Sequence, residues 1–183
     1  MLRERKKQTI CPDFDNIRER IYQLAELAET DGIKKCNIHG AARDVNFLIN
    51  KEEIYLIGWE YGGYGDPGFD IGSYVCGRQH TVEDVERILF TYYRHKPTET
   101  QRRHFYACIA ITGWFFMHWT RLKLSKGQYV GIHKEQWYHF VKNFSLIALR
   151  LYGVPVDEEQ YSVAMEAASY CILENLSFMN AQL

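Results

Sequence analysis

The residues that could carry out chemistry are concentrated between positions 35 and 72. Two short apolar runs, 46–49 and 54–57, are joined by a polar turn, and this pattern predicts a β-hairpin. A glycine-rich segment follows at 61–68, where glycines let the backbone turn tightly and approach a ligand. This layout is typical of a phosphotransferase site. Among the polar side chains of this stretch are His39, Asn46, Glu60 and Asp70.

Two motifs in this stretch are similar to those of a known family. The first reads HGAARDVN over residues 39–46, and the second reads LIGWEYGGYGDPGFD over residues 56–70. Together they resemble the choline/ethanolamine kinase and aminoglycoside phosphotransferase superfamily, and above all its bacterial choline-kinase-like branch. The catalytic loop of that family runs His, any residue, Asp, four residues and Asn, and its metal-binding strand ends in Ile-Asp-Trp/Phe-Glu-Tyr. On these patterns the catalytic aspartate falls at Ala41 and the metal-binding aspartate at Gly58.

The two replaced aspartates have separate roles in phosphoryl transfer. One orients the attacking hydroxyl and accepts its proton, and the other holds the Mg²⁺ that neutralises the phosphates of ATP. Loss of a general base costs about 10²- to 10⁴-fold in rate, and Mg²⁺ requires oxygen ligands. The chain is therefore predicted to be catalytically inactive and to bind neither ATP nor Mg²⁺ productively. Of the family's metal ligands, Asn46 is present but would hold Mg²⁺ weakly. Catalytic activity would require Asp44 or Glu60 to replace the missing aspartates, and Asp44 is expected to be a solvated turn residue.

The resemblance also implies an architecture. The expected fold is α+β and mostly helical, the C-terminal lobe of a protein-kinase-like (aminoglycoside phosphotransferase/choline kinase) fold with a small β-hairpin. Residues 1–183 would form a single domain, with 1–12 frayed, a degenerate catalytic loop and metal-strand region at 35–72, and a helical substrate-side subdomain at 81–176. Only about one helix precedes the loop, without a phosphate-covering glycine-rich segment, so the N-lobe is expected to be absent.

Apolar residues at helical spacing predict helices over most of the chain. Capping boxes are expected at 81–84 and 98–101, and Asp157 is expected to cap the last helix. Asp13 or Asp15 would cap the first helix. The expected helices cover about residues 13–31, 81–94, 98–123, 133–152 and 157–176.

Aromatic residues gather in the two longest expected helices and beside the replaced metal aspartate. In the choline-kinase-like branch the matching residues hold the quaternary ammonium of the substrate, and a cation over a Trp or Tyr face gains about 0.5–2 kcal/mol. By spacing alone the same residues would be core. Gly77 stands where some relatives place a choline-facing glutamate, so a cationic amino alcohol such as choline would bind weakly. The residues of this aromatic box are Tyr61, Trp114, Phe116, Trp119, Trp137 and Tyr138.

The remaining polar residues of interest are expected to be structural. The resemblance implies that His39 braces the loop and that Asp70 accepts hydrogen bonds from beneath it. The Asp66-Pro67 pair could simply form a turn. The basic run at 102–104 is interpreted as a solvated helix end.

Composition limits the other classes of function. A formal net charge of −1 over 183 residues argues against broad electrostatic binding of nucleic acid or membrane. The five cysteines are scattered, with no Cys-x-x-Cys pair and no histidine at zinc-ligand spacing, which favours reduced thiols in a cytoplasmic protein. No apolar run reaches the length that crosses a membrane.

Three functional hypotheses follow. The first is a truncated, inactive choline/ethanolamine-kinase-like phosphotransferase that offers its aromatic pocket to a cationic amino alcohol. The second is a pseudokinase-type interaction module, whose exposed lobe face binds a second copy of the chain or a separate N-lobe. The third is an active kinase complemented by such a lobe.

Overall fold

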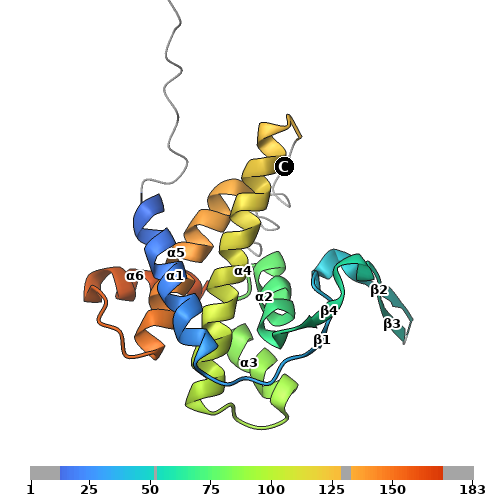
Figure 1. Ribbon diagram of the computed structural model, residues 1–183, viewed down its shortest axis with the longest axis horizontal. Helices are drawn as coiled ribbons and strands as arrows, with labels where there is room; N and C mark the ends of the chain where they lie inside the picture. The colour runs from blue at the N-terminus through green and yellow to red at the C-terminus, as the bar shows by residue number, and fades with distance from the viewer. Residues whose placement is uncertain (1–12, 52, 129–132, 171–183) are drawn as a thin grey trace, which may run out of the picture.

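The chain forms a helical bundle with a small two-stranded hairpin at its side (Figure 1). This computed structural model describes residues 13–51, 53–128 and 133–170, with side chains from residue 136 onward in the last range. The helices are α1 (Phe14–Glu29), α2 (Pro67–Arg78), α3 (Val82–Tyr93), α4 (Glu99–Ser125), α5 (His133–Leu151) and α6 (Glu158–Ala168). The strands are β1 (Cys36–Ile38), β2 (Phe47–Asn50), β3 (Glu53–Leu56) and β4 (Gly63–Gly65), with 3₁₀ turns at Asp44–Asn46 and Trp59–Tyr61.

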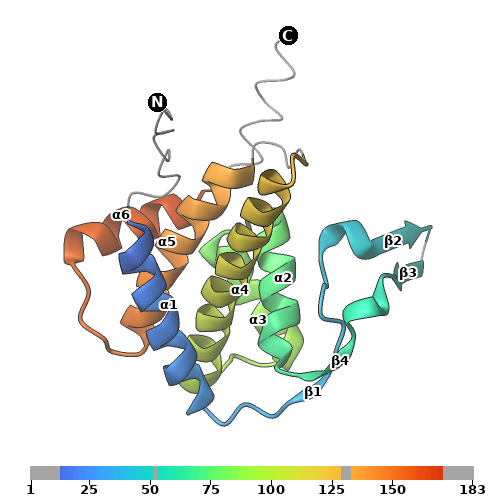
Figure 2. The ribbon, with the colours of Figure 1, turned by 45° about the horizontal axis from the view of Figure 1, so that its top comes forward.

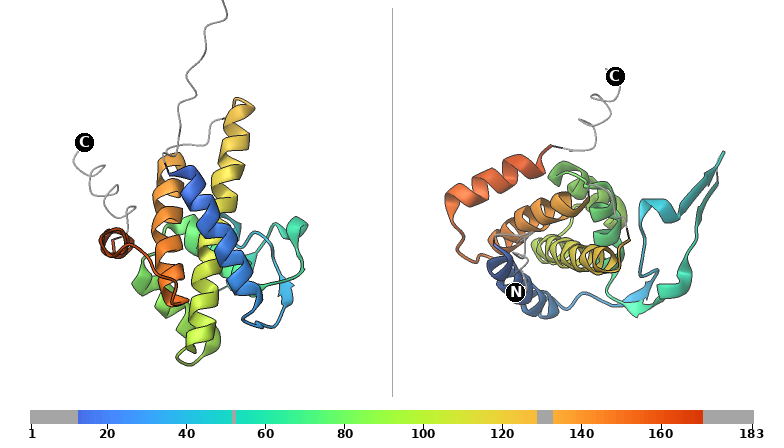
Figure 3. Two further views of the ribbon diagram at one scale, coloured as in Figure 1. Left: turned by 60° about the vertical axis from the view of Figure 1, so that its left-hand side comes forward. Right: turned by 90° about the horizontal axis from the view of Figure 1, so that it is seen from above.

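Helix α4 lies at the centre of the bundle. It packs against α1 and α5 on one side and α2 on the other, and α6 lies beyond α5 (Figures 2 and 3). The outer helices contribute buried apolar side chains on one side, whereas α4 is buried on all sides over residues 104–110. Burial of apolar side chains is the main force that stabilises such a bundle. The largest fully buried side chains include Ile17 and Leu24 of α1, Phe105 and Tyr106 of α4, and Phe144 of α5.

Local capping signals fix several helix starts as the sequence predicts. Thr81 and Asp84 form a reciprocal capping box at α3, and Thr98 and Gln101 form another at α4. The Asp157 carboxylate accepts the hydrogen bond that caps α6. The expected extension of this helix to residue 176, like the expected frayed segment 1–12, falls outside the described residues.

The first helix starts where expected, but the expected side-chain cap is absent in the described structure. Asp13 occupies the N-cap position without capping the backbone. Its carboxylate instead accepts hydrogen bonds from Lys142 Nζ at 2.7 Å and from Tyr138 Oη at 3.1 Å. The aspartate therefore ties α1 to α5, a long-range contact that local sequence does not reveal.

The predicted hairpin is confirmed. Strands β2 and β3 pair antiparallel with Phe47 opposite Leu56 and Asn50 opposite Glu53. The hairpin projects from the bundle (Figure 2), and β1 and β4 form a second antiparallel pair at its base. Apolar side chains of the hairpin face solvent, since Ile49 is 74% and Ile54 67% exposed.

Helix α2 is the element that sequence reasoning missed. The expected Asp66-Pro67 turn is in fact a helix N-terminus: Asp66 caps Gly68 N–H at 2.7 Å, and proline occupies the first helical position. Glycine lowers helix propensity, so the glycine-containing sequence of this segment does not predict a helix. A Cβ at Gly68 would overlap Cys108 Sγ, and one at Gly72 would overlap Thr112 Oγ1. The glycines therefore permit close packing of α2 against α4.

None of the helices in the described ranges combines the length and the apolar character that crossing a membrane requires.

Candidate functional site

The loop after β1 is held from below by the first turn of α2. Asp70 Oδ2 accepts the backbone N–H of His39 at 2.6 Å, and Oδ1 accepts that of Gly40 at 2.8 Å. Gly40 has a φ of +78°, and a Cβ there would overlap the Tyr61 carbonyl oxygen. One carboxylate thus fixes two successive amides at a point where the backbone needs glycine.

His39 joins the same loop to the end of β3. Its Nδ1 accepts the backbone N–H of Ala41 at 3.2 Å, so Nε2 carries the proton and donates to the Ile57 carbonyl at 2.9 Å. The imidazole is 2% exposed, and the Trp59 ring packs edge-on against it at 4.7 Å. With both ring nitrogens used internally, His39 acts on the loop backbone.

The two positions that lack aspartate converge on Asn46. Its Nδ2 donates to the Ala41 carbonyl at 2.8 Å, and a Cβ at Gly58 would lie 3.3 Å from its carboxamide. Gly58 adopts a φ of +82°. The fold therefore brings positions 41, 46 and 58 together. The side-chain oxygen that these three positions supply is that of the Asn46 carboxamide.

Asp44 and Glu60, the carboxylates nearest in sequence to positions 41 and 58, lie in different environments. Asp44, expected to be a solvated turn residue, pairs with Arg78 Nε at 3.1 Å, and about a quarter of its side chain is exposed. This is a correction, because its partner lies on α2, far along the chain. Glu60 lies exposed in the 3₁₀ turn after β3.

The expected aromatic box divides between core and surface. Phe116 and Trp137 are buried and stack at 5.3 Å. Trp114 packs against Phe14 of α1 at 5.0 Å, and Tyr138 faces Asp13. Tyr61 is 69% and Trp119 40% exposed. The structure thus brings Phe116 and Trp137 into ring contact, while the other four residues have contacts in different places.

Arg43 already supplies a cation to the stacked pair. Its guanidinium carbon lies 5.2 Å from the centre of the Phe116 ring, within the range of a cation–π interaction. Its Nε is buried without a hydrogen-bond partner among the described residues. A positive group of the chain itself therefore occupies one face of this aromatic pair.

Comparison with known proteins places this geometry in context. The chain is 26% identical over 126 residues to the protein LicA of Haemophilus influenzae, and 32% identical over 88 residues to a probable ethanolamine kinase of Arabidopsis thaliana. Among solved structures, a choline/ethanolamine kinase family protein from Mesorhizobium loti matches with a TM-score of 0.60 and 15% identity, over 86% of this chain. The choline kinase LicA from Streptococcus pneumoniae matches with a TM-score of 0.62 and 18% identity, over 76% of this chain. The chain has the fold of choline/ethanolamine kinase family proteins.

The likeness covers part of these proteins. The matched regions are 46% of the Haemophilus LicA, 21% of the Arabidopsis protein and about half of each solved chain. The chain thus spans less than half the length of its curated relatives. A LicA structure in complex with AMP also matches, with a TM-score of 0.63. No known protein-family profile matches the chain.

A buried polar cluster connects the segment after α1, the start of α2 and helix α4, and the sequence analysis does not predict it. In the run at 102–104, expected to be solvated, Arg102 and Arg103 are partly exposed and His104 is buried. His104 Nε2 lies 2.9 Å from Asp66 Oδ2, and its Nδ1 lies 3.5 Å from Asp31 Oδ2. Arg103 and Tyr152 also bond to Asp31. This is a correction, because partners 72 residues apart cannot be read from a basic run.

The electrostatics of this cluster follow from burial and hydrogen bonding. Burial raises the pKa of Asp66, but hydrogen bonds from His104 and the Gly68 N–H lower it, and the pKa ends below its ordinary value. Burial raises the pKa of the Cys108 thiol, whose Sγ lies 3.4 Å from His104 Nε2. Burial and the hydrogen bond to Asp31 raise the pKa of the Tyr152 hydroxyl.

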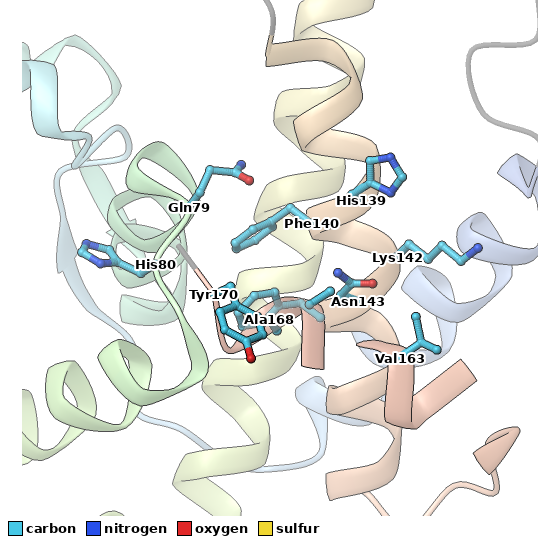
Figure 4. A pocket seen from close by; sticks show the side chains of 11 residues that line it. Gln79, His80, His139, Phe140, Lys142, Asn143, Val163, Ala168 and Tyr170 are labelled. Atoms are coloured by element: carbon cyan, nitrogen blue, oxygen red, sulfur yellow. The ribbon is translucent and has the colours of Figure 1, made fainter. Parts of the chain in front are cut away.

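A cavity of about 370 Å³ lies elsewhere, between the end of α2, α5 and α6 (Figure 4). Gln79 extends toward Phe140 at one side, and Tyr170 and Ala168 border the other. None of the site residues expected from sequence lines it. The cavity is therefore separate from the catalytic-loop region.

Proposed function

We propose that this chain carries the catalytic-loop and substrate-side part of a choline/ethanolamine-kinase-like small-molecule phosphotransferase, in a catalytically inactive form. The observation that carries the proposal is the convergence of positions 41 and 58 on Asn46 above a loop that Asp70 holds by two amides. The scaffold of a phosphotransferase site is kept, while the two carboxylates that would act there are replaced by Ala41 and Gly58.

The residues present do not fit a magnesium-nucleotide site. Mg²⁺ is a hard cation that takes oxygen ligands in near-octahedral geometry. Positions 41 and 58 supply no side-chain oxygen, and the Asn46 amide nitrogen is engaged with the Ala41 carbonyl. No catalytic step can be assigned to the metal or to ATP in this chain, because a base for the acceptor hydroxyl is also missing.

A cationic amino alcohol such as choline fits the aromatic region more readily than ATP fits the loop. The exposed rings of Tyr61 and Trp119 offer faces to an ammonium group, and this binding needs no metal. Phe116 and Trp137 are buried and stacked, so an ammonium group would reach this pair only at the face that Arg43 covers. Arg43 competes with it at Phe116. Binding would therefore be weak.

The test compares the full chain with two double variants in one assay. Wild type is expected to show no choline phosphorylation and no thermal shift with Mg-ATP. Ala41→Asp with Gly58→Asp should gain a Mg²⁺-dependent thermal shift, because the new carboxylates would join Asn46. The control, Ala41→Asn with Gly58→Asn, has the same bulk without the charge and should gain none. Turnover by wild type would contradict inactivity and favour an active kinase in which Asp44 or Glu60 substitutes.

A second candidate function, a pseudokinase-type interaction module, is favoured by the hairpin. Exposed apolar side chains lie on both faces of the projecting hairpin and on the turns beside it, and a concentration of such side chains is typical of a protein-binding surface. The partner would be a second copy of this chain or a separate nucleotide-binding lobe. The exposed residues are Val45, Leu48, Ile49, Ile54, Tyr55, Ile57, Trp59, Tyr61 and Tyr64.

Light scattering after size exclusion separates these partners. Self-association that Ile49→Lys with Ile54→Lys abolishes would identify a second copy. Val163→Lys on α6, which replaces another exposed apolar side chain, is the control and should leave the mass unchanged. A monomer at all concentrations would exclude the second copy and leave the separate lobe.

A further inference from the structure

We propose that Asp66, His104 and Cys108 bind a thiophilic divalent transition-metal ion such as Zn²⁺, at a site distinct from the catalytic loop. This inference goes beyond the proposed function and does not depend on it. Carboxylate oxygen, imidazole nitrogen and thiolate sulfur are the ligands that Zn²⁺ takes in proteins.

The three ligand atoms are already gathered. His104 and Cys108 lie four residues apart on one face of α4, and Asp66 reaches them from the N-cap of α2. All three atoms lie within 4.8 Å of one another. The sequence signal for such a site is the four-residue spacing of His104 and Cys108, and the proposal therefore departs from the expectation of no histidine at zinc-ligand spacing.

The distances fit an ion with little rearrangement. Ligands bound to Zn²⁺ at about 2.0–2.3 Å in a tetrahedron, one of them sulfur, stand roughly 3.3–3.6 Å from one another. Asp66 Oδ2 and His104 Nε2 are 2.9 Å apart, and Cys108 Sγ and His104 Nε2 are 3.4 Å apart. A small outward shift of Asp66 therefore opens the space, and because its side chain is 36% exposed, water can reach the fourth position.

The surroundings suit a metal-bound imidazole. A histidine ligand usually directs its second ring nitrogen at a carboxylate, which fixes the ring and its tautomer. His104 Nδ1 is buried without a hydrogen-bond partner in the described structure, and Asp31 Oδ2 stands 3.5 Å away. Arg103 holds Asp31 in place through two guanidinium nitrogens at 2.6 and 2.8 Å. With a metal on Nε2, the ring proton moves to Nδ1 and faces Asp31.

Charge balance favours a cation here. Asp31 and Asp66 bring two negative charges, Arg103 and Lys35 bring two positive charges, and the Cys108 thiolate of the bound form adds a third negative charge. Binding would exchange a proton for the metal: the Cys108 S–H bond breaks, the proton leaves to solvent, and the thiolate sulfur bonds to the ion. No oxidation or reduction takes place.

The experiment is a Co²⁺ titration of the reduced, chelator-treated full chain, followed by Zn²⁺ displacement. Cobalt bound to a thiolate is expected to give a near-ultraviolet charge-transfer band that saturates at one ion per chain and is lost on addition of Zn²⁺. Cys108→Ser should abolish the band. Cys76→Ser is the matched control, because Cys76 is a buried thiol on α2 that bonds to the Ile109 carbonyl outside the cluster; it should keep the band.

Asp66→Asn provides the second variant in case Cys108→Ser unfolds, since its side chain is partly exposed and its shape is kept. It should weaken Co²⁺ binding at least tenfold. Absence of the band in wild type would overturn the proposal, and so would a band that survives in folded Cys108→Ser or an unchanged affinity in Asp66→Asn. Those outcomes would leave a purely hydrogen-bonded cluster.

Discussion

Asp70 holds His39 by its backbone and not by its ring. The carboxylate accepts the amides of His39 and Gly40 at 2.6 and 2.8 Å, while the imidazole is engaged with Ile57 and Ala41. The conformation of the loop therefore depends on a negative charge on α2.

Asp70→Asn is expected to destabilise the fold by about 1.5–3 kcal/mol, because charge-assisted hydrogen bonds contribute that much and the new amide group would face an N–H donor. Urea unfolding measures the loss. Asp15→Asn is the control: its carboxylate is largely exposed and pairs only with a neighbouring arginine on the surface, so a change below about 0.5 kcal/mol is expected. Equal losses in the two variants would contradict the role given to Asp70.

Gly40→Ala is expected to destabilise the chain by more than the roughly 1–2 kcal/mol that a left-handed backbone costs a residue with a Cβ. The added methyl group would also overlap the Tyr61 carbonyl. Thermal unfolding is the measurement. Gly63→Ala, at a glycine with open space around its Cβ position, should stay within about 1 kcal/mol of wild type.

Arg43→Gln is expected to strengthen choline binding by roughly 2- to 30-fold, which corresponds to a cation–π contact of about 0.5–2 kcal/mol made free for the ligand. Tryptophan fluorescence reports binding through Trp137, which stacks on Phe116. Arg121→Gln removes a guanidinium that lies over Phe14 instead, so it should leave the affinity unchanged. A weaker affinity in Arg43→Gln would show that Arg43 supports the pocket.

Acid stability should depend on Asp66. Because its pKa is lowered in the folded state from the ordinary value of 3.8, its carboxylate stabilises the fold above that pH, and this contribution is lost as the pH falls through the lowered pKa. In Asp66→Asn, measured with a chelator present, the free energy of unfolding should fall less steeply below about pH 4. Parallel curves for wild type and variant would disprove the assignment.

Local sequence patterns were sufficient to predict most of the secondary structure. The capping boxes at Thr81 and Thr98 involve residues three apart, and the hairpin needs only two apolar runs and a turn, so both could be predicted. Helix α2 could not, because the close approach of Gly68 and Gly72 to α4 is a tertiary contact that compensates for low helix propensity.

The candidate site was predictable in part for the same reason. His39, Asn46 and Asp70 follow a motif with fixed spacing, and the fold brings them together. The aromatic residues carry no such spacing, so the sequence could not tell that Trp114 turns toward Phe14 while Phe116 faces Trp137. The contact of His104 with Asp31 joins two segments far apart in the sequence, so it could not be predicted from sequence.

Asp66 and Asp70 leave the same end of α2, four residues apart. One is bonded to His104 in the bundle, and the other to the loop after β1. A displacement of this helix end would therefore disturb both attachments together. The kinase-like loop and the helical bundle share this anchoring point, beside the contacts of Arg43 with Phe116 and of Asp44 with Arg78, so a change of position in one is expected to affect the other.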